Sequence, residues 1–184
     1  GWHMDSTYMP VQAKGAVFTA HTVPASGGET GWADTRAAYR ALDPEMRERI
    51  AGLSAYHSLW YSQAKLGHKP KVGEGYGFHE LEHPLRPLIK VHPETGDKML
   101  TIGRHAYGIP GLEEPASEAL LQELVDFACR APRVYHHEWT PGDAVVWDNR
   151  RLMHQACPWD MHEPRIMYHA RIAGSQESEF AAHA

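Results

Sequence analysis

A histidine and an aspartate separated by one residue stand at the start of the sequence, which begins Gly-Trp-His-Met-Asp-Ser. If this segment is a β-strand, the side chains of His3 and Asp5 point to the same face, because side chains alternate along a strand. An imidazole and a carboxylate placed in this way can bind one metal ion. The pair alone is weak evidence, since the chain contains 14 histidines and 23 acidic residues.

A second histidine would complete a site of two imidazoles and one carboxylate. That ligand set leaves three coordination positions open, as a non-haem Fe(II) oxygenase requires for a chelating cosubstrate and O2. His154 is the candidate, because it follows the β-like run at 144–147. Eleven residues later comes Arg165, and a guanidinium is suited to bidentate binding of a carboxylate such as the remote carboxylate of 2-oxoglutarate. We interpret residues 148–150 as a brace for the turn that presents His154.

The elements that would position these residues are mostly strands. Turn residues, rather than crossover helices, separate most of them, which favours a mainly β fold with inserted helices, an antiparallel sandwich or jelly roll, over a parallel α/β sheet. The predicted strands lie at 14–24, 88–92, 98–103, 134–139, 144–147 and 165–172, and the predicted helices begin near Asp34 or Thr35, begin at Asp43, and span 115–130.

The stretch at about 55–83 is rich in Gly, Lys, His and aromatic residues and is expected to be irregular. Long irregular segments in compact domains are usually binding lids or disordered segments. The aromatic residues favour a lid, because a fully solvated loop would not carry so much apolar surface.

The length and composition of the chain are typical of a single soluble domain covering residues 1–184. Apolar residues make up 42% of the chain and charged residues 22%, and no apolar run is long enough to span a membrane. The net charge of −5 argues against a nucleic-acid partner. Two cysteines and no signal peptide favour a cytoplasmic location. Because the first candidate ligand lies two residues from the start, we also expect that preceding sequence is missing.

Taken together, these motifs resemble the taurine dioxygenase family of Fe(II)/2-oxoglutarate-dependent oxygenases. The segments that carry the resemblance are Trp-His-Met-Asp-Ser at 2–6, Gly-Gly-Glu-Thr at 27–30, Trp-Asp-Asn-Arg at 147–150 with His154, and Arg165. Within that family, the segments at 23–39 and 105–112 are similar to the chlorophenoxyacetate and phenoxypropionate dioxygenases.

The resemblance implies a double-stranded β-helix in which His3, Asp5 and His154 hold Fe(II), while Thr30 and Arg165 bind 2-oxoglutarate. It also implies an N-terminal part before the His-x-Asp motif that this sequence lacks. The implied reaction consumes O2 and 2-oxoglutarate, releases succinate and CO2, and hydroxylates a small anionic substrate. If the hydroxylated carbon bears an ether oxygen, as in an aryloxyalkanoate, the product collapses to a phenol and an oxo acid. The family also tends toward homo-oligomers.

Candidate substrate contacts follow from spacing and from position near the motifs. His169 and Arg171 share a strand face with Arg165, so either could meet an anionic substrate. The arginine that grips the sulfonate in taurine dioxygenases corresponds to His169 here, which weakens a taurine substrate. Four further residues are candidates. Ser6 borders the metal motif, His105 and Tyr107 follow a predicted strand, and Tyr61 lies in the expected lid.

Two other functions stay open at this stage. The first is oxidation of sulfonates or alkyl sulfates by the same chemistry. The second is a non-catalytic jelly-roll module that binds a metal or another ligand.

Overall fold

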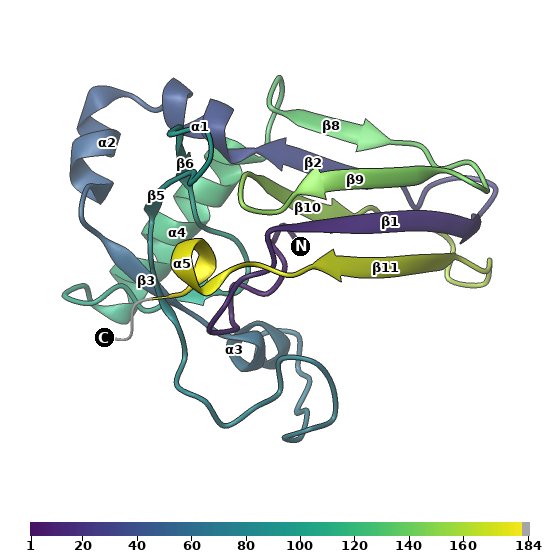
Figure 1. Cartoon of the computed structure of the whole chain (residues 1–184), viewed down its shortest axis with the longest axis horizontal. Coiled ribbons are helices and arrows are strands. Elements are labelled where there is room, and N and C mark those ends of the chain that lie inside the picture. The colour runs from purple at the N-terminus through teal and green to yellow at the C-terminus, as the bar shows by residue number, and fades with distance from the viewer. Residues whose placement is uncertain (182–184) are drawn as a thin grey trace.

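Two three-stranded antiparallel sheets form one part of the protein in the computed structural model, which describes residues 1–181 (Figure 1). The first sheet has the order β11-β1-β9, with β11 at Ile166–Ile172, β1 at Gly15–Thr22 and β9 at Ala144–Asp148. The second has the order β10-β2-β8, with β10 at Leu152–Ala156, β2 at Thr30–Asp34 and β8 at Val134–His137. Buried residues from both sheets, including Ala16, Trp32 and Trp147, pack together between them.

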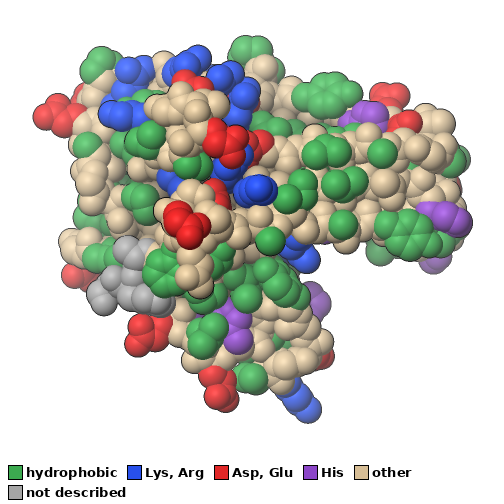
Figure 2. Space-filling model, in the orientation of Figure 1, with side chains coloured by type: hydrophobic (Ala, Val, Ile, Leu, Met, Phe, Trp, Pro, Cys, Tyr) green, Lys and Arg blue, Asp and Glu red, His purple; other side chains and the backbone are tan. Residues whose placement is uncertain are grey.

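The register of the first sheet determines which side chains point between the sheets. Buried Ala16 is paired with Arg171 on one side and with Trp147 on the other, and Phe18 is paired with His169. Arg171 and His169 therefore lie on the inner face. The opposite face carries exposed apolar side chains such as Val146 and Tyr168, and Figure 2 shows hydrophobic groups along this part of the surface.

Helices and short strands form the other part of the molecule (Figure 1). Helices α1 (Thr35–Ala41), α2 (Pro44–Ile50) and α3 (Leu59–Ala64) each begin after a residue whose side chain caps the helix: Asp34, Asp43 and Ser58. Long helix α4 (Glu114–Ala128) buries Leu120, Leu121 and Leu124 in the main core. The remaining elements are β3 (Ser54–His57), β4 (Leu85–Pro87) and β7 (Ala106–Tyr107) in one sheet, the hairpin of β5 (Ile89–Val91) and β6 (Lys98–Leu100), and α5 (Gln176–Glu179).

Most of the predicted elements are present, with shifted ends. The mainly β character, the three predicted helices and the hairpin are confirmed. The prediction of an irregular segment at 55–83 is partly wrong, because Ser54–His57 is a strand and Leu59–Ala64 is a helix; residues 65–83 contain only turns and bends. His3 and Asp5 do not lie on a regular strand, since His3 makes one isolated bridge and a turn begins at Asp5.

The described helices include none with the length and apolar character that a membrane crossing requires.

Candidate metal centre

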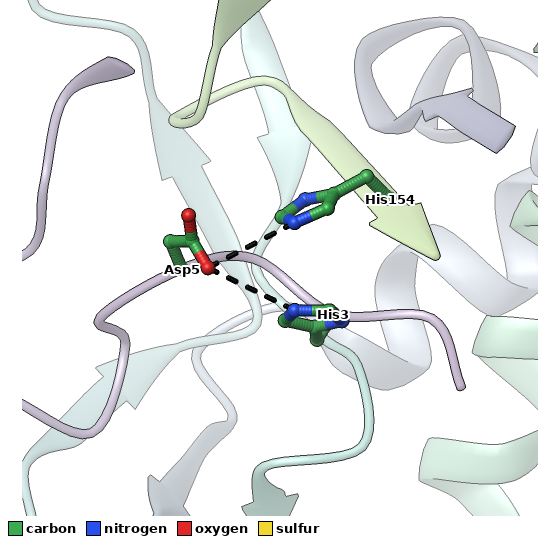
Figure 3. A group of neighbouring side chains, drawn as sticks. All are labelled: His3, Asp5 and His154. Atoms are coloured by element: carbon green, nitrogen blue, oxygen red, sulfur yellow. Dashed lines mark ion pairs between the residues drawn. The ribbon is translucent and has the colours of Figure 1, made fainter. Parts of the chain in front are cut away.

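His3, Asp5 and His154 converge from distant parts of the chain, and their potential ligand atoms all lie within 4.8 Å of one another (Figure 3). The Nε2 atoms of His3 and His154 are each 3.8 Å from Oδ1 of Asp5. Two ligands at right angles, each ~2.1 Å from one ion, lie ~3 Å apart. Small rotations of these side chains would therefore bring three donors around a single ion.

Backbone pairing sets this arrangement. The amide of His3 donates to the carbonyl of His154 over 3.0 Å, and the amide of His154 donates back over 2.8 Å. This bridge attaches the N-terminal segment to β10. Asn149, in the turn before β10, hydrogen-bonds the backbone of Asp5 in both directions at 2.8 Å. The prediction that residues 148–150 brace the turn carrying His154 is therefore incomplete, because Asn149 also holds the segment that carries Asp5.

The electrostatics of the three side chains suit a metal ion. Burial, followed by the nearby His154 and Arg104, lowers the pKa of His3 to about 3. Burial also lowers the pKa of His154 to about 4, although the charge of Asp5 opposes the shift. For Asp5, burial raises the pKa, but the hydrogen bond with His169 and the charges of His154 and His3 lower it overall. Near neutral pH the site thus has two neutral imidazoles and one carboxylate, the protonation states that metal binding requires.

Thr30 and Arg165 are neighbours at one end of the two sheets. Nη2 of Arg165 lies 3.4 Å from Oγ1 of Thr30, and Nε of Arg165 donates to the carbonyl of Gly28 over 3.0 Å. The Thr30 hydroxyl also accepts a hydrogen bond from Nε1 of Trp139. Within residues 1–181, the guanidinium of Arg165 is hydrogen-bonded to Gly28 and Thr30 and has no carboxylate partner.

Four of the candidate substrate residues surround the three potential ligands. Nε2 of His169 lies 3.0 Å from Oδ2 of Asp5, and Nε of Arg171 lies 3.8 Å from the same atom. Ser6 directly follows Asp5, is fully buried and has a positive φ of 59°. The ring of His105 lies 5.4 Å from that of His3, and its Nδ1 is hydrogen-bonded to Ser62.

Tyr61 and Tyr107 lie together, in a different environment. Their rings are stacked with centroids 4.8 Å apart. The Tyr107 hydroxyl is hydrogen-bonded to His83, and the Tyr61 hydroxyl donates to Glu118 of α4 over 2.6 Å. Neither tyrosine has a described contact with His3, Asp5 or His154, and Tyr61 belongs to helix α3 rather than to an irregular lid.

Sequence reasoning missed three further residues at this site. Trp147 is a core residue between the two sheets, and its ring also lies 4.9 Å from that of His154 and stacks on His169 at 5.7 Å. Arg104 is near enough to His3 to affect its pKa. Tyr76 reaches the site from the segment 65–83. Of these three residues, only Trp147 had a sequence position that indicated closeness to the metal centre, because it lies seven residues before the predicted ligand His154 and at the end of a predicted strand.

A mainly β protein with two imidazoles and one carboxylate converging at its interior has the donor set of non-haem Fe(II) oxygenases. Comparison with known sequences gives the particular family. Residues 1–171 match the taurine catabolism dioxygenase TauD, TfdA family. The chain belongs to this family.

Two similar curated proteins are each named (S)-phenoxypropionate/alpha-ketoglutarate-dioxygenase. The one from Sphingobium herbicidovorans is 64% identical, over 98% of this chain and 64% of its own length. The one from Delftia acidovorans is 58% identical, over 98% of this chain and 63% of its own length. The chain thus spans slightly less than two thirds of these relatives.

Solved structures show the same fold. A structure of AAD-2 in complex with Mn(II) and N-oxalylglycine has a TM-score of 0.89 and 36% identity, covering 100% of this chain and 71% of that one. A taurine dioxygenase from Burkholderia xenovorans has a TM-score of 0.80 and 26% identity, covering 100% of this chain and 62% of that one.

Proposed function

We propose that this protein is an Fe(II)- and 2-oxoglutarate-dependent dioxygenase that hydroxylates an aryloxyalkanoate. The observation that carries the proposal is the convergence of His3, Asp5 and His154 in a member of this family. The names of the relatives that are 64% and 58% identical support the substrate class. Residues 1–184 would belong to one catalytic domain, built on a double-stranded β-helix and located in the cytoplasm.

The three converging side chains would hold Fe(II). Their donor atoms fit this metal, because imidazole and carboxylate together are the ligands of a facial triad that keeps three positions open. The buried site keeps the imidazoles neutral, so no proton competes strongly for their nitrogen atoms. When bound, iron with 2-oxoglutarate and O2 supplies the oxidation that converts 2-oxoglutarate to succinate and CO2 and hydroxylates the substrate.

Thr30 and Arg165 would bind the distal carboxylate of 2-oxoglutarate. The Arg165 guanidinium is held by the Gly28 carbonyl and lies over the ring of Trp159, at 5.2 Å from its centroid. These contacts fix its orientation and leave donor atoms for a carboxylate, which guanidinium groups bind in a bidentate manner. Thr30 would contribute its hydroxyl, which already lies beside Nη2 of Arg165.

The substrate would occupy the space next to Asp5, bordered by His169, Arg171, Ser6 and His105. Arg171 supplies a positive charge for the substrate carboxylate, and its contact with Asp5 is long, at 3.8 Å. An ion pair between Arg171 and the substrate carboxylate would orient the substrate so that the carbon bearing the ether oxygen faces the metal. Hydroxylation of that carbon gives a hemiacetal, which collapses to a phenol and a 2-oxo acid. Tyr61 and Tyr107 would support the wall formed by α3 rather than bind substrate directly.

The test is turnover of 2-oxoglutarate by the Fe(II)-loaded, full-length protein. With a phenoxypropionate, we expect succinate and phenol in equal amounts, whereas taurine or an alkyl sulfate should not couple succinate release to its own cleavage. Coupled cleavage of a sulfonate or a sulfate ester in place of the aryloxy acids would contradict the proposed substrate class. Absence of succinate with every substrate, in protein that binds the metal, would favour a non-catalytic binding module.

A further inference from the structure

Tyr76 connects the segment 65–83 with the residues around the metal centre. Its hydroxyl donates to Oγ of Ser6 over 3.1 Å, and the Cζ atom of Arg171 lies 4.6 Å from the centroid of its ring. Its ring also meets that of Tyr8 edge to face, with centroids 6.2 Å apart. Although 51% of Tyr76 is exposed, this side chain therefore contacts both chain segments that border the proposed substrate space.

The neighbouring sequence fixes the place of Tyr76. Gly77 has a φ of +91°, and a Cβ atom there would lie only 2.3 Å from a ring carbon of Tyr8, so only glycine lets the backbone lie against that ring. The next residue, Phe78, packs edge to face on Trp60 of α3 at 5.1 Å. Nε1 of Trp60 donates to the carbonyl of His79 over 3.3 Å. The three residues directly after Tyr76 are thus anchored against Tyr8 and helix α3.

Arg171 has little else to hold it. Within the described part of the chain its guanidinium donates no hydrogen bond, and its single ion pair is the 3.8 Å contact with Asp5. A long side chain of this kind loses considerable rotamer entropy when a ligand orders it. A guanidinium over an aromatic face is attracted to the ring, most strongly where water is excluded. The ring of Tyr76 therefore restricts Arg171 before a substrate arrives.

On the basis of the function proposed above, we propose that Tyr76 is a positioning residue for Arg171. Its ring orients the guanidinium to receive the carboxylate of an aryloxyalkanoate, and its hydroxyl ties the segment 73–79 to Ser6. Figure 1 places α3 and the loop after it in a part of the molecule that projects beside β11, and Figure 2 shows an indentation of the surface between them. From this loop Tyr76 contacts Arg171 of β11, so a substrate that binds Arg171 would stabilise the segment further.

The first test measures binding, not turnover. The full-length protein is loaded with Mn(II) and 2-oxoglutarate without O2, and the Kd of a phenoxypropionate is measured by calorimetry. Tyr76→Leu should raise this Kd ~5-fold, or ~1 kcal/mol at 1.4 kcal/mol per tenfold. Tyr76→Trp should restore most of the affinity, and Tyr76→Phe should have a smaller effect than Tyr76→Leu, because both keep an aromatic face. An unchanged Kd in Tyr76→Leu would overturn the proposal.

A double-mutant cycle separates positioning from direct contact with substrate. If Tyr76 acts through Arg171, Tyr76→Leu should cause no further loss of affinity in the Arg171→Gln background. Equal losses in both backgrounds would mean that Tyr76 acts independently of Arg171, which contradicts the proposal. Tyr135→Leu is the matched control, since Tyr135 is a similarly exposed tyrosine on β8 and should leave the Kd unchanged.

Proteolysis gives a second result that does not depend on catalysis. The segment contains Lys71, and the phenoxypropionate should slow tryptic cleavage after this residue in the wild type but not in Tyr76→Leu. If these binding results hold but no succinate forms, the dioxygenase proposal fails while the role of Tyr76 stands. If succinate and phenol form but the variants bind normally, the role of Tyr76 fails alone.

Discussion

Asn149 and Asp5 are joined by a reciprocal pair of hydrogen bonds, although their positions in the sequence differ by 144. Nδ2 of Asn149 donates to the Asp5 carbonyl, and the Asp5 amide donates to Oδ1 of Asn149, each over 2.8 Å. The same Nδ2 donates to the carbonyl of Ala13. The side-chain amide therefore binds the irregular N-terminal segment as a neighbouring strand would, and it does so at the backbone of Asp5, which is itself a potential metal ligand.

The first prediction is that Asn149→Ala destabilises the protein and weakens metal binding. The substitution leaves the Asp5 amide and the two carbonyls without partners in a buried environment, at a cost of ~3 kcal/mol in the free energy of unfolding. Denaturant unfolding measures this value, and Mn(II) titration measures the accompanying loss of affinity. Gln122→Ala, which removes an exposed amide from α4, should change the unfolding free energy by less than ~0.5 kcal/mol. Similar effects of the two substitutions would refute the assigned role of Asn149.

The second prediction concerns acid stability through Asp148. Burial would raise the pKa of this residue, but hydrogen bonds from Arg150 and from His92 at 2.8 Å lower it to about 2. Because the folded-state pKa lies below the unfolded value near 4, the ionised carboxylate stabilises the fold above pH ~4, and this contribution is lost as the pH falls toward 2. Allowing for partial exposure, it is worth ~1 to 2 kcal/mol.

Unfolding of the wild type and of Asp148→Asn at several pH values tests this prediction. The unfolding free energy of the wild type should exceed that of Asp148→Asn by the whole contribution of the charge near pH 6, and this difference should decrease between pH 4 and pH 2. Asp126→Asn, at an exposed carboxylate on α4, serves as the control. A difference for Asp148→Asn that stays constant down to pH 2 would show that its charge is not responsible.

The sequence was sufficient for the elements with strong local signals and for the convergence of three residues. Helix α4 has buried leucines at helical spacing, and α2 begins with Asp43 followed by proline, so local patterns determine both. The strand β2 was missed because Thr30–Asp34 is short, contains glycine and is buried along most of its length, so it shows no polar alternation. Its place is determined by pairing with β8 and β10, which local sequence does not encode.

Contacts made across long sequence distances explain the other omissions. Asn149 was interpreted as part of a local turn because its partner at Asp5 lies at the far end of the chain. Tyr76 lies in a segment without periodicity, and its interactions with Ser6 and Arg171 come from opposite ends of the sequence. Tyr107 was a candidate because it follows a predicted strand, and Tyr61 because it lies in the expected lid, but the two rings stack on each other.

The third prediction separates binding of 2-oxoglutarate from binding of substrate. Arg165→Gln should raise the KM for 2-oxoglutarate by ~30- to 100-fold, because a bidentate pair with a carboxylate is worth ~2 to 3 kcal/mol. Arg165→Lys should recover part of this loss as a single charge, and Thr30→Val should raise the KM ~5-fold. The KM for a phenoxypropionate should change little in all three variants. If these substitutions raised the KM for the phenoxypropionate more than the KM for 2-oxoglutarate, Arg165 and Thr30 would bind the substrate and not 2-oxoglutarate, which would contradict the proposed roles.

The fourth prediction is that a divalent metal stabilises the fold through the three converging side chains. A ligand present at 100 times its Kd adds ~2.7 kcal/mol to the unfolding free energy, which corresponds to an increase in Tm of ~5 to 10 °C for a chain of this size. Mn(II) should produce this shift in the wild type, as measured by calorimetry without O2. His3→Ala and His154→Ala should each abolish most of it, since either change leaves two donors for the ion. His21→Ala, at an exposed histidine on β1, should retain the full shift. A shift that survives both ligand substitutions would mean that Mn(II) binds elsewhere and that the convergence of His3, Asp5 and His154 does not constitute the metal site.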